Sequence, residues 1–82
     1  IVLITIYTHR DNQNETPYQT LKELLPLEKS HISQSLAHNE KDGLIAKPEN
    51  NKYFTTIKIT LEGIITTERY IASLNKILNQ HP

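Results

Sequence analysis

The sequence contains no cysteine, methionine or tryptophan, and it has only two glycines among its 82 residues. Without cysteine the chain can form neither a disulfide bond nor a cysteine-based zinc site, which fits a reducing compartment. No apolar run approaches the length of about 20 residues that a membrane-spanning helix requires, and no signal-peptide pattern is present. The missing methionine leads us to expect that the string is a piece of a longer protein.

An excess of either charge is also absent, since nine Lys and Arg residues oppose nine Asp and Glu residues. Proteins that hold nucleic acid through bulk electrostatics carry a basic excess, so this balance argues against that mode of binding. It leaves room for local contacts, in which a few lysines and many neutral donors meet the phosphates. The length suits one small globular domain, whose limited core often depends on a partner chain or on further helices.

Residue patterns for catalysis or metal binding are lacking as well. The spacing of the four histidines matches no H-E-x-x-H or related zinc motif; they are His9, His31, His38 and His81. Two glycines do not supply a glycine-rich phosphate loop, and no Ser-His-Asp arrangement is recognisable. We therefore expect neither an enzyme nor a resident metal or cofactor.

A first amphipathic helix is predicted over Thr16–Leu25. Thr16 is expected to be its N-cap, Pro17 suits the first helical position, and Gln19 stands three residues after the cap, as in a capping box. Pro26 ends the helix because proline cannot continue it. A turn over residues 26–28 then leads to the next helix, an order typical of a helix-turn-helix.

The second helix is predicted over Lys29–Asp42, and Gly43 provides the left-handed position that stops it. Ile32 and Leu36 lie four residues apart on one face. The opposite face is rich in hydrogen-bonding side chains and consists of Ser30, His31, Ser33, Gln34, Ala37, His38 and Lys41. Such a face suits the reading of base edges in a DNA groove, but it is also compatible with an ordinary solvated surface. The residues alone leave both interpretations open.

From Leu44 onward the pattern changes to that of strands. Residues 44–47 and 52–60 are predicted to form two strands joined by a turn over residues 48–51, which gives a β-hairpin. Lys47 and Lys52 flank the tip of this hairpin. They either lie along a minor groove or its phosphates, or simply keep the hairpin edge soluble.

The last predicted element is a long C-terminal helix. Ile64, Ile71 and Leu78 recur every seven residues, with Leu74 between the last two. This apolar face is widened by Ile65, Ala72 and Ile77. Because so short a chain has little core left to cover the face, we favour packing against another subunit over simple burial in its own core.

Two stretches resemble one known family. The run LEKSHISQSLAHNEKDGLI at residues 27–45 resembles the recognition helix and its exit in MarR-type winged helix-turn-helix regulators. Residues 59–63 (ITLEG) resemble that family's Leu-Thr-x-x-Gly step into its long C-terminal helix. The resemblance implies a mainly α fold with a small β-hairpin, that is, a two- to three-stranded wing. Residues 1–60 would then be the winged helix-turn-helix DNA-binding domain, and residues 61–82 the start of the dimerisation helix.

The resemblance also implies a function. The chain would belong to a cytoplasmic, homodimeric, sequence-specific regulator of transcription that binds double-stranded DNA and answers to a small-molecule inducer. The residues implied for the major groove are Ser30, His31, Ser33, Gln34 and His38. Those implied for the wing contacts are Lys47, Asn51 and Lys52. An inducer cleft between the DNA-binding lobe and the dimer helices would be lined by Tyr7, Tyr18 and Tyr70.

For the N-terminal segment, local propensity and the resemblance predict different structures. Residues 1–7 are β-branched and apolar, so local propensity predicts a strand. The resemblance implies a helix that packs beneath the helix-turn-helix. We favour the helix, because a buried helix can be apolar on all sides.

Three departures from the family pattern keep an alternative open. Residues 49–52 lack the arginine that the family inserts into the minor groove, and the recognition helix has no arginine to read guanine. Ser35 and Asn39 stand where the family has apolar residues, and a buried Asn without partners costs stability. The alternative function is a winged-helix module for protein–protein contact without DNA binding. A helical fragment without the hairpin is a third, structural, possibility.

Overall fold

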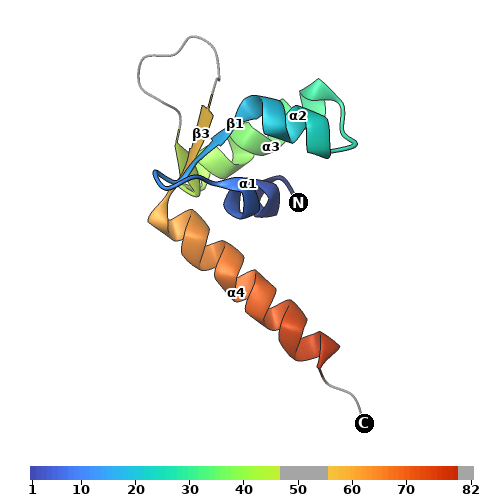
Figure 1. The fold of residues 1–82 in the computed structure, drawn as a ribbon, viewed down its shortest axis with the longest axis vertical. Coiled ribbons are helices and arrows are strands. Elements are labelled where there is room, and N and C mark those ends of the chain that lie inside the picture. Colours follow the sequence, from blue (N-terminus) through green and yellow to red (C-terminus); the bar gives the residue numbers. More distant parts are fainter. Residues whose placement is uncertain (47–55, 80–82) are drawn as a thin grey trace.

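A computed structural model of the chain describes residues 1–46 and 56–79. These residues form a mainly helical fold with four helices and one small antiparallel sheet of three strands (Figure 1). In chain order the elements are α1 (Val2–His9), β1 (Glu15–Pro17), α2 (Tyr18–Leu24), α3 (Lys29–Lys41), β2 (Ile45–Ala46), β3 (Thr56–Ile59) and α4 (Leu61–Leu78). Helices α1 to α3 gather beside the sheet, whereas α4 projects away from them (Figure 1).

Strand β3 is the central strand of the sheet, between β1 and β2. Ile45 and Ala46 pair antiparallel with Ile59 and Lys58, so the predicted pairing of these two segments is confirmed. The pairing argues against a helical fragment without a hairpin. The turn predicted over residues 48–51 lies outside the described residues.

Strand β1 corrects the start of the helix that was predicted over Thr16–Leu25. Thr16 was expected to cap that helix, but it lies in β1, paired with Ile57 and fully buried. Its Oγ1 donates a hydrogen bond of 2.8 Å to the carbonyl oxygen of Ile6 in α1. The helix begins two residues later, at Tyr18, without a side-chain cap. A strand of three residues is too short to show its alternation, and its pairing with β3 outweighs the local capping signal.

The loop between α1 and β1 is shaped by one carboxylate. Asp11 Oδ1 accepts hydrogen bonds from the backbone N–H groups of Gln13 (2.8 Å) and Glu15 (3.0 Å). Asn14 adopts a φ of 62°, a left-handed conformation that Asn tolerates better than most residues. The backbone N–H of Ile59 then donates to the Asn14 carbonyl oxygen at 2.9 Å. The loop thus delivers β1 to the edge of β3.

One hydrophobic core joins the helices to the sheet. Segment 1–7 is confirmed as helical, with Val2 and Ile6 of α1 buried four residues apart, so tertiary packing overrides its strand propensity. The buried hydrophobic residues are Val2, Ile6, Leu21, Leu25, Ile32, Leu36, Ile45, Ile57 and Ile59. One small core therefore holds α3 against α1, α2 and the sheet.

The junction between α3 and α4 is tight. Gly43 has the positive φ, 75°, that the predicted helix stop requires. Thr60, the N-cap of α4, accepts a hydrogen bond from the Gly63 N–H (3.1 Å) and donates its own hydroxyl to the Gly43 carbonyl oxygen (2.6 Å). A Cβ on Gly63 would lie only 2.1 Å from the carbonyl oxygen of Leu44. Only glycine lets the base of α4 approach the exit of α3 so closely.

Candidate nucleic-acid interface

Helix α3 has one buried and one exposed face. Ile32 and Leu36 are 1% and 2% exposed and attach the helix to the core. The helix spans Lys29–Lys41, within one residue of the predicted bounds, and Asp42 is its C-cap. Solvent reaches all five of the α3 side chains that were expected to contact DNA, namely Ser30, His31, Ser33, Gln34 and His38. Their exposure meets the first requirement of a contact with DNA.

The exposed face offers free hydrogen-bonding groups. Within the part of the chain that the structure describes, the side chains of His31 and Gln34 have no hydrogen-bond partner, and the same holds for Ser30 and Ser33. Hydroxyl, amide and imidazole groups together supply both donors and acceptors. An external ligand could therefore bind this face without first breaking an internal side-chain hydrogen bond.

The charges around this face nearly cancel. His38 Nε2 lies 3.4 Å from Asp42 Oδ2, one turn further along, and both side chains are more than half exposed. An exposed pair of this kind contributes only about 0–1 kcal/mol. Lys29 and Lys41 are offset by Glu28 and by the acidic residues near the end of the helix. Recognition at this face would depend on hydrogen bonds more than on a positive field.

The wing residues named from the sequence, Lys47, Asn51 and Lys52, lie outside the described residues. In the sequence they lie between the last described residue of β2, Ala46, and the first described residue of β3, Thr56. The structure thus brings together the five α3 residues and leaves the other three as predictions.

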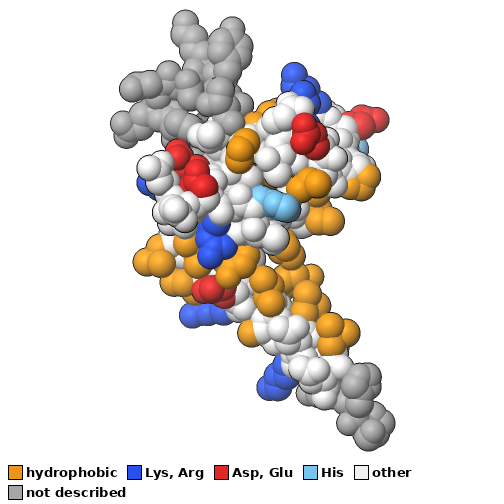
Figure 2. Space-filling view, viewed as in Figure 1, with side chains coloured by type: hydrophobic (Ala, Val, Ile, Leu, Met, Phe, Trp, Pro, Cys, Tyr) orange, Lys and Arg blue, Asp and Glu red, His pale blue; other side chains and the backbone are white. Residues whose placement is uncertain are grey.

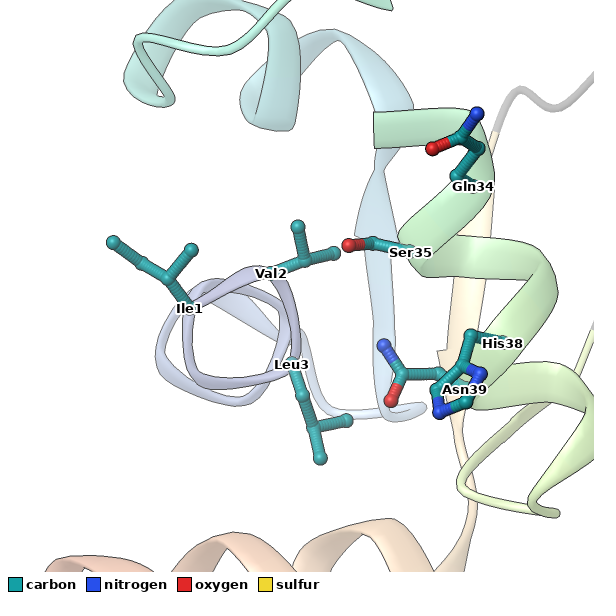
Figure 3. Close-up of a pocket in the computed structure, with 7 residues that line it drawn as sticks. All are labelled: Ile1, Val2, Leu3, Gln34, Ser35, His38 and Asn39. Carbon is teal, nitrogen blue, oxygen red and sulfur yellow. The ribbon is translucent and has the colours of Figure 1, made fainter. Parts of the chain in front are cut away.

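A hollow of about 470 Å³ lies between α3 and the first turn of α1 (Figure 3). It is lined by Ile1, Val2, Leu3, Gln34, Ser35, His38 and Asn39. In Figure 3 the side chain of Ser35 points toward Val2, and Asn39 points into the space between the two helices. Both residues are only partly buried, so solvent can satisfy their polar groups. This removes the cost expected for polar residues at positions where the MarR-type pattern has apolar ones.

A second hollow, of about 370 Å³, separates α1 from α4. Its lining residues are Ile1, Leu3, Ile4, Thr66, Thr67 and Tyr70. Of the three tyrosines expected around an inducer cleft, Tyr70 lines this hollow, whereas Tyr18 packs against the core. The hydroxyl of Tyr7 instead donates a hydrogen bond of 2.9 Å to Glu68 Oε2 of α4. Sequence reasoning missed this contact, because residues 61 positions apart give no local signal.

The outer half of α4 presents an apolar surface. Its large exposed side chains are Tyr70 (51%), Leu74 (39%), Ile77 (65%) and Leu78 (65%). Hydrophobic side chains run along much of the visible side of this helix (Figure 2). In the described chain these four side chains stay exposed, and the main contacts of α4 are with α1.

Comparison with protein-family models, with curated proteins and with solved structures found no match to this chain. The resemblance to MarR-type regulators therefore stands on the motifs of residues 27–45 and 59–63. Within residues 1–46 and 56–79, no cluster of three or more His, Asp or Glu side chains is placed to hold a metal ion. No described helix combines the length and apolar character needed to cross a membrane.

Proposed function

We propose that the chain is the DNA-binding part of a homodimeric winged helix-turn-helix regulator of transcription, of the MarR type. In this proposal α2 and α3 form the helix-turn-helix, and β2 and β3 form the stem of the wing. The observation that carries the proposal is the exposed face of α3, where four polar side chains have no hydrogen-bond partner in the described chain, namely Ser30, His31, Ser33 and Gln34. A helix held so firmly by Ile32 and Leu36 can enter the major groove as a rigid body.

The chemistry of this face suggests how it would read DNA. Gln34 can form a bidentate pair with adenine N6 and N7, while Ser30 and Ser33 can bond to bases or phosphates. These three residues occupy the first half of α3, the part of a recognition helix that contacts base edges. Because α3 has no Arg, we expect a preference for A·T-containing half-sites over runs of guanine.

The wing and the dimer complete the proposal. Lys47, Asn51 and Lys52 would contact phosphates beside the minor groove, since Lys suits a narrow groove less well than Arg. The apolar side of α4 would pack against a second copy, placing the two α3 helices about 34 Å apart, one turn of DNA. A small-molecule inducer would bind in the hollow between α1 and α4. We expect such a regulator to act in the cytoplasm.

The test is equilibrium binding of the full chain to DNA across a salt series, after selection of a preferred sequence. A variant with His31→Ala and Gln34→Ala is compared with a variant carrying His9→Ala and Gln13→Ala. The control removes the same two side-chain types from exposed sites outside α3. We expect the α3 variant to lose roughly tenfold to a hundredfold in affinity for the selected sequence, because each base contact contributes about 1–3 kcal/mol. Its affinity for random DNA should change little.

A second candidate function is a winged-helix module that binds another protein. The balanced charge, and the Asp42 carboxylate beside His38, favour it. The same salt series separates the two functions, since phosphate contacts make DNA affinity fall steeply with salt. A folded dimer that fails to bind duplex DNA at low salt would rule out the regulator and leave the protein-binding module.

A further inference from the structure

Helix α4 is anchored at its first turn to the end of α3. The Thr60 N–H donates to the Leu44 carbonyl oxygen at 3.0 Å, and the Thr60 hydroxyl bridges Gly43 and Gly63. The Thr67 hydroxyl bonds back to the Gly63 carbonyl oxygen at 2.8 Å and is itself buried. These bonds fix the position of the base of α4. They leave its direction to contacts further along the helix.

Apolar packing against α1 defines that direction only in part. The hollow of about 370 Å³ lies between the two helices, bounded by Leu3 and Ile4 on one side and by Thr66 and Tyr70 on the other. Well-packed interiors have few voids larger than a water molecule. Because this space is open, α4 can tilt about its base without an immediate clash.

One polar contact spans the same two helices. The hydroxyl of Tyr7 donates to Glu68 Oε2 at 2.9 Å, and the guanidinium carbon of Arg10 lies 4.0 Å from the centre of the Tyr7 ring. Arg10 Nη1 also donates to the Tyr7 carbonyl oxygen, which holds the guanidinium over the ring. In the described chain no other side-chain hydrogen bond joins α1 to α4. This contact therefore has no substitute.

We infer that Tyr7 and Glu68, with Arg10 as support, are positioning residues that fix the angle between α4 and the rest of the fold. The consequence for DNA, which rests on the proposed function, is that they set the separation of the two α3 helices in the dimer. From Gly63 to Leu78 the helix extends roughly 22 Å, at about 1.5 Å per residue. A tilt of about 10° moves its far end by roughly 4 Å, close to the rise of about 3.4 Å per base pair. The contact thus determines half-site spacing.

The angle is tested by a distance measurement within one chain. The sequence has no cysteine, so Lys22→Cys on α2 and Ser73→Cys on α4 provide two exposed sites for spin labels. The labelled full chain is mixed with an excess of unlabelled chain, so that distances within one copy dominate the double electron–electron resonance signal. Ser73 lies about 15 Å along the helix from Gly63, so with a tilt of about 10° Tyr7→Phe and Glu68→Ala should shift or broaden the distance distribution by roughly 2–3 Å. Glu68→Gln keeps an acceptor oxygen and should retain the original distribution.

Two outcomes overturn the inference. If Tyr7→Phe and Glu68→Ala fold normally by circular dichroism and leave the distances unchanged, the contact does not set the angle. If the distances change but the preferred half-site spacing, selected from duplexes with spacers of different length, stays the same, the contact does not set the spacing. Failure of the unmodified protein to bind any duplex would refute the proposed function, while the distance result would still decide the role of Tyr7 and Glu68.

Discussion

Replacement of Gly63 by alanine should weaken the fold, although alanine is the better helix former. An ordinary Gly→Ala change inside a helix stabilises it by about 1 kcal/mol. Here the new Cβ would lie 2.1 Å from the Leu44 carbonyl oxygen and 2.7 Å from Ile59 Cγ1. The first of these atoms belongs to the backbone, so α4 and the Leu44 backbone, just before β2, must separate by nearly an ångström to relieve the overlap.

The free-energy cost of this separation follows from the hydrogen bonds that it stretches. It stretches the hydrogen bond from the Thr60 N–H to Leu44 and the bond from the Thr60 hydroxyl to Gly43, which are 3.0 and 2.6 Å long. Losing one or two such bonds costs about 1–2 kcal/mol, and overpacking adds about 1–3 kcal/mol. After the gain in helix propensity, we expect Gly63→Ala to lower the free energy of unfolding by about 1–4 kcal/mol.

The assay is urea unfolding followed by circular dichroism, at one protein concentration because a dimer would make stability concentration-dependent. Gly43→Ala is the matched control: its φ is 75°, but no atom lies within 4 Å of an added Cβ. It should cost about 1–2 kcal/mol, from backbone strain alone. A Gly63→Ala protein as stable as the original, or more stable, would refute the close approach of α4 to the Leu44 backbone.

Further substitutions test other parts of the structure. Thr16→Val should destabilise the fold by about 1–3 kcal/mol in the same assay, because it leaves the buried Ile6 carbonyl oxygen without its hydroxyl donor; an unchanged stability would contradict the role of β1. Leu74→Glu with Ile77→Glu should leave helix content intact but convert the proposed dimer to a monomer in sedimentation analysis, whereas Lys76→Glu should not. A dimer that persists in the double variant would contradict the packing of α4 against a second copy. His38→Ala should change stability by less than about 1 kcal/mol, since its ion pair is exposed.

Helix α3 is the part of the fold that local sequence signals describe best. The bounds of α3 follow from Ile32 and Leu36 at helical spacing and from Gly43 at the stop. Both signals come from the helix itself and the residues directly after it. The pairing of β2 with β3 follows in the same way from a change in period near Leu44. Short-range patterns of this kind survive folding because the core and the turn chemistry agree.

The errors lie where distant residues decide. Thr16 carries a strong capping signal, yet pairing with Ile57 and bonding to Ile6 place it in a strand. For residues 1–7 the helix that we favoured is confirmed, but strand propensity alone would have failed, because burial of Val2 and Ile6 decides. The contact between Tyr7 and Glu68 has no sequence signature, since it depends on the angle at which α4 leaves the fold. In the candidate site, the exposure of the α3 residues was predictable from the apolar spacing, whereas the hollow beside Ser35 and Asn39 was not.

The central claim is that the exposed face of α3 contacts DNA. It is tested most directly by recording backbone amide resonances of the isotope-labelled full chain while duplex DNA is added. The account predicts that the largest shifts fall on residues 30–38, with smaller ones on the proposed wing contacts Lys47, Asn51 and Lys52. Shifts confined to α4 or to α1, or no shifts at low salt, would contradict it and favour a module that binds protein instead.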